Sequence, residues 1–218
     1  MNNDTTPTPP PSTMVSVTGT GRASRPPDMA EITVGVSVTR RTVAEASDEA
    51  AGLTSALLTA VKSHGVQDRD LKTTNYTVMA EYDHRSQPAR LVGYRVDSAL
   101  AVIVRNLEQF PAVLAAATEA GGDATTIGGI RFGHQDPSAL VTEARELAWN
   151  DAVAAAVQLA ELAGRRLGSV RRIVEGGPRC PRPQPALTRG AVMEAASVPI
   201  EGGTVSQDLR IEVDFELE

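Results

Sequence analysis

Apolar and polar residues alternate along seven segments of this 218-residue chain, a pattern typical of β-strands with one buried face. In residues 29–39, for example, Ile32, Val34 and Val36 fall on the same side. A polar loop of seven residues separates the third strand from the fourth and predicts a hairpin. The predicted strands are residues 14–20, 29–39, 71–82, 90–105, 125–133, 167–175 and 204–217.

Three segments with helical periodicity lie between these strands. Thr42 and Glu45 form a capping box before the first helix. Asp136 followed by Pro137 is a start signal for the third and longest helix. The predicted helices are residues 43–63, 107–120 and 137–163. The apolar stripe predicted on the third helix consists of Leu140, Ala144, Leu147, Ala148, Asp151 or Ala152, Ala155, Leu159, and Leu162 or Ala163.

The order of these elements predicts an α+β fold. Residues 29–133 follow the order βαββαβ, which is typical of a ferredoxin-like core. Its sheet is expected to be mixed or antiparallel, with crossover helices covering one face. The long third helix and the C-terminal strands, with the first strand as a further candidate, are expected to form a smaller second layer.

The predicted domain organisation is one domain over residues 14–217 that follows a disordered tail at 1–13, which has four prolines. Beyond the βαββαβ core, residues 134–217 hold the long helix, a strand, a Pro/Gly-rich excursion at 176–203 and the closing strand. Five prolines and five glycines fall in this excursion, so we expect it to be mobile or to pack against a neighbouring subunit.

Composition removes several classes of protein. A net charge of -6 argues against a protein that coats nucleic acid non-specifically. The single cysteine, Cys180, excludes an internal disulfide framework, and the three histidines are too far apart for a metal motif. We therefore expect no metal and no cofactor. No apolar run is long enough to span a membrane, and the start resembles no secretory leader, so a cytoplasmic location is predicted. If the numbering begins after a removed signal, the location is periplasmic or secreted.

Motifs of common enzymes are missing from the sequence: it contains no nucleophile elbow, zinc-protease motif or P-loop. The pair Gly19 and Gly21 follows a predicted strand, but a dinucleotide fingerprint needs a third glycine and a helix directly after it. Residues 22–27 cannot begin that helix because they contain two prolines. We interpret the two glycines as part of a turn.

A run of arginines is the clearest candidate for a binding site in this acidic chain. It could bind an anionic small molecule, a partner or nucleic acid, or form salt bridges between subunits. Aromatic residues do not interleave with it, which disfavours single-stranded nucleic acid. The run consists of Arg165, Arg166, Arg171, Arg172, Arg179 and Arg182.

Three tyrosines, Tyr76, Tyr82 and Tyr94, gather in the predicted hairpin. Their hydroxyl groups suggest an amphipathic strand surface that could serve as an interface. The alternative is ordinary packing across the strands of one sheet. Both interpretations remain open at the level of sequence.

The order and spacing of several short motifs resemble the SIMPL domain family (DUF541) over residues 15–217. These motifs are VTGTG at 17–21, PDMA at 27–30, VGV at 34–36, TNY at 74–76, YD at 82–83, VGYR at 92–95, IGGIRF at 127–132, DP at 136–137, EAR at 143–145 with Ala148, DA at 151–152 and LA at 159–160, LGSV at 167–170 and TV at 204–205. The resemblance implies an α+β fold and a tendency to self-assemble. Family members are often envelope or periplasmic proteins of bacteria, and no catalytic residue is established that could be carried over to this chain.

These observations predict a non-enzymatic protein that assembles with itself or binds a partner. A homo-oligomer is expected, because the first strand, the C-terminal strand and helix 137–163 offer more apolar surface than one small sheet would cover. The alternative is a binding module that holds an anionic molecule or partner at the arginine run. An enzyme of unrecognised type is the third hypothesis.

Overall fold

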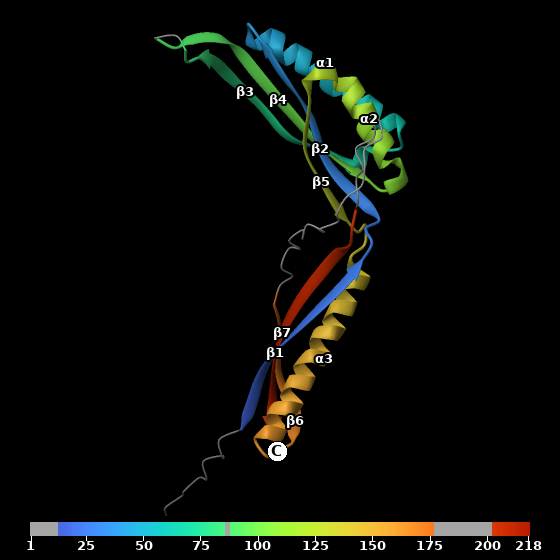
Figure 1. Cartoon of the computed structure of the whole chain (residues 1–218), viewed down its shortest axis with the longest axis vertical. Coiled ribbons are helices and arrows are strands. Elements are labelled where there is room, and N and C mark those ends of the chain that lie inside the picture. The colour runs from blue at the N-terminus through green and yellow to red at the C-terminus, as the bar shows by residue number, and fades with distance from the viewer. Residues whose placement is uncertain (1–12, 86–87, 177–201) are drawn as a thin grey trace, which may run out of the picture. The chain divides into compact units, whose positions relative to one another are not determined.

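The computed structural model describes residues 13–85, 88–176 and 202–218 (Figure 1). These residues form seven strands in two antiparallel sheets together with three α-helices, which confirms the predicted α+β class. The strands are β1 (Met14–Arg25), β2 (Met29–Arg40), β3 (Leu71–Asp83), β4 (Arg90–Val104), β5 (Thr125–Gly133), β6 (Leu167–Gly176) and β7 (Val205–Leu217). The helices are α1 (Val43–Ser63), α2 (Phe110–Gly121) and α3 (Ser138–Leu162).

The chain divides into two compact units. The four-stranded unit comprises β2 to β5 with α1 and α2, and its continuous segment is residues 27–135. The three-stranded unit comprises β1, β6 and β7 with α3. The four-stranded unit is therefore inserted in the sequence between β1 and α3.

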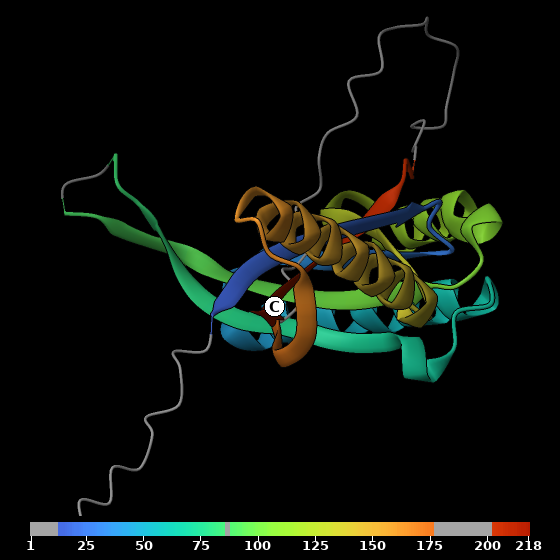
Figure 2. The same ribbon diagram turned by 90° about the horizontal axis from the view of Figure 1, so that it is seen from below.

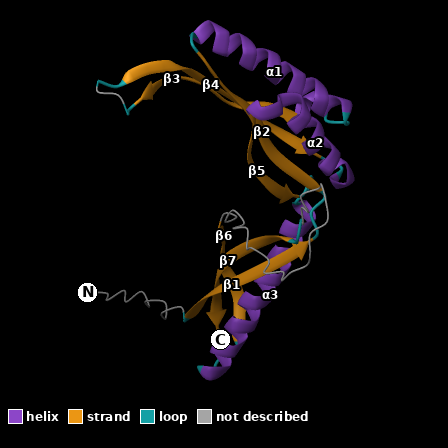
Figure 3. Ribbon diagram, turned by 45° about the horizontal axis from the view of Figure 1, so that its top comes forward, coloured by secondary structure: helices purple, strands orange, loops and turns teal. Residues whose placement is uncertain are grey.

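The strand order of the four-stranded unit is β3-β4-β2-β5, with every neighbouring pair antiparallel. Strands β2 and β3 consequently run parallel, with β4 between them, which is the split βαβ arrangement predicted for residues 29–133. Helices α1 and α2 lie together on one face of this sheet (Figure 3). Alternate residues of β2 and β4 point into the core between the sheet and these helices, among them Ile32, Val34 and Val102.

Local signals explain where the helices of this unit begin and end. The hydroxyl of Thr42 accepts a hydrogen bond from the backbone N–H of Glu45, and the Glu45 carboxylate accepts one from the N–H of Thr42, so the predicted capping box is confirmed. Gly65, which follows the helix, has a φ of 88°. The sequence also predicts Asn106 as the cap of the second helix. Asn106 instead caps a short 3₁₀ turn, and α2 begins only at Phe110.

The three-stranded unit has the strand order β1-β7-β6 (Figure 3). Strand β1 pairs with β7 along its whole length, from Met14 opposite Glu216 to Arg25 opposite Val205. Helix α3 covers one face, where it contacts chiefly β1 and β7. This arrangement confirms the predicted second layer and includes the first strand in it.

The interpretation of Gly19 and Gly21 as a turn is wrong, because both residues lie inside β1. They allow α3 to approach the strand closely. A Cβ atom added at Gly19 would lie 2.0 Å from the backbone oxygen of Ala148, and one at Gly21 would lie 1.9 Å from that of Ala144. The glycines therefore set the distance between strand and helix.

The apolar stripe predicted on the third helix is only partly correct. Its buried residues are spaced four apart and, after the first, are all alanines: Leu140, Ala144, Ala148, Ala152, Ala156 and Ala160. The larger members of the predicted stripe, Leu147, Leu159 and Leu162, are instead 43%, 45% and 78% exposed. Only small side chains fit where α3 meets the glycines of β1, so leucines are displaced from this contact.

Two predicted segments lie almost wholly outside the described residues: the tail at 1–13, except Thr13, and the Pro/Gly-rich excursion at 176–203, except its ends. The carbonyl of Thr13 accepts a hydrogen bond from the N–H of Leu217 at 2.9 Å. None of the described helices is both long enough and apolar enough to cross a membrane.

Candidate functional site

The arginine run lies around β6 in the three-stranded unit. Arg171 forms a salt bridge with Glu216, and Arg172 lies 3.7 Å from Asp214. Arg166 lies 3.9 Å from the side-chain carboxylate of Glu218. In the part of the chain that the structure describes, no carboxylate lies within ion-pair distance of Arg165. Arg179 and Arg182 fall outside the described residues.

Carboxylates of β7 thus face Arg171 and Arg172, and the carboxylate of Glu218, just after β7, faces Arg166. The hydroxyl of Ser169 and the guanidinium of Arg171 both donate to Glu216, and these hydrogen bonds lower the pKa of its carboxyl group. A paired guanidinium offers an incoming anion less net charge than a free one. Binding of an anion at the run therefore stays a prediction.

Further ion pairs connect the other elements of this unit. Arg22 on β1 donates to both carboxylate oxygens of Asp208 on β7, at 2.5 and 2.9 Å. Arg145 on α3 donates to both oxygens of Glu175 on β6, at 2.7 and 3.0 Å. These two-point contacts lower the pKa values of Asp208 and Glu175. These two ion pairs thus connect β1 to β7 and α3 to β6 within the unit.

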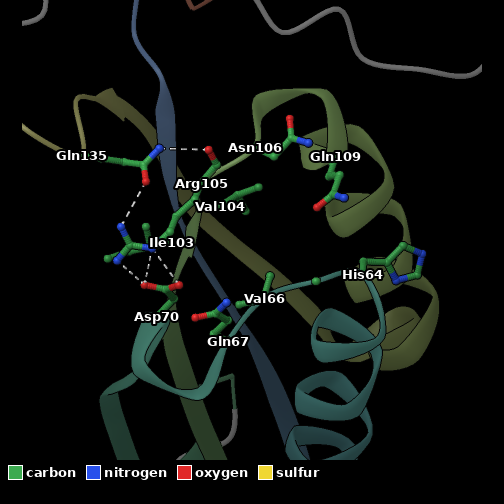
Figure 4. Close-up of a pocket in the computed structure, with 11 residues that line it drawn as sticks. His64, Val66, Gln67, Asp70, Ile103, Val104, Arg105, Asn106, Gln109 and Gln135 are labelled. Atoms are coloured by element: carbon green, nitrogen blue, oxygen red, sulfur yellow. Dashed lines mark hydrogen bonds and ion pairs between the residues drawn. The ribbon is translucent and has the colours of Figure 1, made fainter.

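A cavity of about 180 Å³ lies in the four-stranded unit, next to the end of β4 and the end of α1 (Figure 4). Asp70, Arg105 and Gln135 form one side of it, Gln67 lies next to Asp70, and Gln109 lies on the opposite side. The lining combines polar groups with the apolar residues Val66, Ile103 and Val104, and its two formal charges come from adjacent side chains. This cavity is the strongest candidate for a small-molecule site among the described residues.

The charged groups of this cavity bind each other. Arg105 Nε donates to both oxygens of Asp70 at 3.0 Å, and Nη2 donates to Oδ1 at 2.7 Å, while Asp70 itself is only 4% exposed. Arg105 Nη1 also donates to Gln135 Oε1 at 3.2 Å, and the N–H of Gln135 donates to Asp28 at 2.8 Å. The contact with Asp70 raises the pKa of Arg105. This network holds together the start of β2, the start of β3 and the end of β4.

The sequence gives little sign of the Asp70–Arg105 pair, because the two residues are 35 positions apart and neither belongs to a motif. The described residues also contain no group of three or more His, Cys, Asp or Glu side chains that could hold a metal ion. Nothing in the cavity combines a free nucleophile with a base that could activate it. Its geometry fits a structural ion pair better than a reaction site.

A cluster of exposed apolar side chains on the β3–β4 hairpin is a further surface feature. We call it the hairpin surface; its residues are Tyr76, Val78, Met79, Tyr82, Leu91 and Val92, each 40–56% exposed. Residues 90–93, at the start of β4, pair only with β3. This end of the hairpin is therefore a two-stranded ribbon, which extends away from α1 and α2 (Figures 1 and 2). A two-stranded ribbon with apolar side chains gains stability when another surface covers it.

The three tyrosines of the hairpin differ in their surroundings. Tyr76 lies opposite Ser98, Tyr82 opposite Leu91 and Tyr94 opposite Ala80. Tyr76 and Tyr82 remain 54% and 49% exposed, whereas Tyr94 is partly buried. Cross-strand packing therefore leaves about half of two of these side chains open to solvent.

Comparison with known proteins gives a match over nearly the whole chain. The family model SIMPL, described as a protein of unknown function (DUF541), matches residues 15–215. The chain is 33% identical over 214 residues to the 26 kDa periplasmic immunogenic protein of Brucella melitensis, covering 93% of this chain and 84% of that protein. It is 25% identical over 213 residues to the uncharacterized protein YggE of Escherichia coli, covering 94% and 83% respectively. The family match extends across both units.

Proposed function

Because this chain belongs to the SIMPL family, whose function is unknown, we propose from its surface that it acts without catalysis, by assembling with copies of itself or by binding a partner protein. The hairpin surface is the observation that carries this proposal. Six large apolar side chains are exposed on one hairpin: Tyr76, Val78, Met79 and Tyr82 on the edge strand β3, and Leu91 and Val92 on the neighbouring strand β4. Large apolar side chains left exposed together on one hairpin are characteristic of protein–protein contacts.

The surface that supports assembly differs from the one that the sequence suggests. Strands β1 and β7 and helix α3 bury their apolar residues against each other, including Leu209, Ile211, Val213 and Phe215. Strands β1 and β7 therefore supply less free apolar surface than expected, whereas α3 still exposes Leu147, Leu159 and Leu162. The hairpin surface is a second exposed apolar region, and it favours the interface interpretation of Tyr76 and Tyr82 over packing within one sheet.

The cavity supports a non-catalytic role because its charged residues already satisfy each other. Arg105 makes three contacts with Asp70 and one with Gln135, so neither charge is free to act on a substrate. The alternative function, binding of an anion at the arginine run, is weakened because Arg171 and Arg172 face carboxylates of β7.

A location outside the cytoplasm is part of the proposal. The relatives from Brucella melitensis and Brucella abortus are named as periplasmic proteins, and each is 33% identical to this chain. The cytoplasmic location predicted from the sequence has no such support. Fractionation of the native host into periplasm and cytoplasm, followed by immunoblotting, distinguishes the two locations.

Self-assembly is tested by the mass of the purified chain in solution. Light scattering coupled to size exclusion should give a mass that is a multiple of 22.9 kDa and that falls on dilution. A mass that stays at 22.9 kDa over a hundred-fold range of concentration would contradict self-assembly.

A further inference from the structure

The two sheets have four edge strands, and three of them are protected against pairing with another chain. On β1, the N–H of Thr20 donates to Asp151 of α3 at 2.8 Å, so the helix covers this edge. Strand β5 is irregular beside Gly129, which has a φ of 150°. Strand β6 has two irregularities and carries Arg171 and Arg172. Cover by a helix, bulges and charged side chains are the usual protections of a sheet edge.

The fourth edge strand, β3, lacks these protections in its central part. Its pairing with β4 is regular from Asn75 to Glu81, between irregularities at either end. Residues 75–80 (NYTVMA) contain no charge, proline or glycine. Tyr76 and Val78 project from one face and Met79 from the other, and all three are at least 40% exposed. An uncharged, regular and apolar edge is a template for adding another strand.

We infer that β3 pairs antiparallel with β3 of a second copy, about a two-fold axis that passes through Val78. This inference rests on the proposed self-assembly and assigns a surface and a register to it. Val78 is the middle residue of the regular segment, so a two-fold axis there places the whole segment opposite itself. The two edges then form one continuous sheet and satisfy each other's outward backbone groups.

The side chains fit each other in this register. Val78 lies opposite Val78 of the second copy, and Tyr76 lies opposite Ala80, so apolar side chains meet on one face. On the other face, Asn75 lies opposite Glu81, where the amide can donate to a carboxylate oxygen. No pair of like charges is opposed.

Charge at the two ends of β3 favours the antiparallel arrangement of identical strands. Lys72 lies near the start of β3, and Asp83 is its last residue. Antiparallel pairing brings the basic end of each copy to the acidic end of the other. A parallel arrangement would instead place Lys72 beside Lys72 and Asp83 beside Asp83, which destabilises the pair. The strand is therefore complementary to a second copy of itself.

Disulfide cross-linking tests both the surface and the register. Across a two-fold axis, residue 78 of the two copies would be separated by about 4.5–5.5 Å between Cα atoms, within the range for a disulfide. In a Cys180→Ser background, Val78→Cys should form a covalent species of twice 22.9 kDa under mild oxidation. Thr77→Cys is the control on the same strand, because its copies would be diagonal at about 7–8 Å. Ile127→Cys, 51% exposed on β5, is the control on the opposite edge.

A charge variant gives a second measurement that needs no cysteine. Val78→Lys places two ammonium groups opposite each other and should raise the dissociation constant up to about five-fold, seen as a lower mass by light scattering. Ile127→Lys on β5 should keep the parent mass. Circular dichroism of both variants shows whether they are folded. If Val78→Lys is unfolded, its lower mass says nothing about the interface, and the cross-linking result alone decides whether β3 pairs with β3.

The outcomes separate this inference from the proposed function. An assembled parent with specific cross-linking through Val78→Cys supports both. An assembled parent in which Thr77→Cys or Ile127→Cys links as readily as Val78→Cys overturns the inference and leaves self-assembly intact. A purified parent that is monomeric at every concentration, as expected if a different protein occupies this edge, overturns both the inference and self-assembly.

Discussion

The two units of this protein are both antiparallel sheets covered by helices on one face, yet their cores are built differently. In the four-stranded unit, branched side chains such as Leu57, Val61 and Ile32 fill the space between helix and sheet. In the three-stranded unit, the alanines of α3 lie against the glycines of β1. Large side chains keep a helix at a distance from its sheet, and small ones let it approach. The core of the four-stranded unit should therefore be more sensitive to the loss of a large side chain, and the core of the three-stranded unit to the addition of a methyl group.

Removal of a large side chain should have its greatest effect in the four-stranded unit. Leu57 is fully buried in α1, so Leu57→Ala should lower the free energy of unfolding by about 3 kcal/mol, through lost burial and the cavity left behind. Hydrogen exchange of peptides from α1 measures this loss within the unit. Leu162→Ala on α3, where the side chain is 78% exposed, is the control and should change the stability by less than about 0.5 kcal/mol. If Leu57→Ala and Leu162→Ala lowered the free energy of unfolding equally, the assignment of Leu57 to the core and of Leu162 to the surface would be contradicted.

Addition of a methyl group should have its greatest effect in the three-stranded unit. Gly21→Ala brings a Cβ to 1.9 Å from the Ala144 oxygen and should destabilise the unit by about 1–3 kcal/mol. Trp149, the sole tryptophan, packs beside Phe215 in this unit, so its fluorescence reports the unfolding directly. Gly52→Ala is the matched control: no atom lies within 4 Å of the added Cβ, and α1 should gain about 0.5–1 kcal/mol. If Gly21→Ala and Gly52→Ala changed the free energy of unfolding in the same direction, the comparison would be refuted.

Acid should weaken the three-stranded unit through its carboxylates. Hydrogen bonds from Arg145, Arg22 and Ser169 lower the pKa values of Glu175, Asp208 and Glu216. The folded unit then binds fewer protons than the unfolded chain, so this stabilisation is present above the ordinary pKa values of 4.5 for Glu and 3.8 for Asp, and is lost as the pH falls through the lowered ones. The exposed pairs make the effect small.

Thermal unfolding followed by Trp149 fluorescence at a series of pH values measures this loss. Asp208→Asn removes one of the titrating groups and should flatten the dependence of the melting temperature on pH below about 4.5. A variant whose melting temperature follows the parent curve throughout the acid range would show that the Arg22–Asp208 pair contributes nothing to it.

Much of the fold follows from local patterns. Alternation identified every strand, and the capping box fixed the start of α1, because both signals depend on neighbours within a few residues. The path of β1 was harder to predict. Its glycines resemble a turn unless one knows that Ala144 and Ala148, more than a hundred residues later, lie against them. Periodicity also favours leucines as the buried face of α3, whereas the close contact selects alanines.

The candidate site was less accessible from the sequence than the fold. Arginines in a short run are easy to notice, but their partners on β7, among them Asp214 and Glu216, are more than forty residues away along the chain. The ion pair of Asp70 and Arg105 depends likewise on tertiary structure. The tyrosines of the hairpin are easy to find in the sequence, but their exposure, on which the proposed interface depends, is known only from the structure.

The insertion of one unit between β1 and α3 has a consequence for biosynthesis. The four-stranded unit has its last strand once Gly133 has been made, but β1 must wait for β7, which ends at Leu217. At about 5–20 residues per second, a ribosome needs roughly 4–17 s for the intervening residues. During these seconds β1 has no strand partner while its neighbour in sequence is able to fold. The first strand to leave the ribosome is thus among the last to pair, and a chaperone that binds extended segments has its best opportunity there.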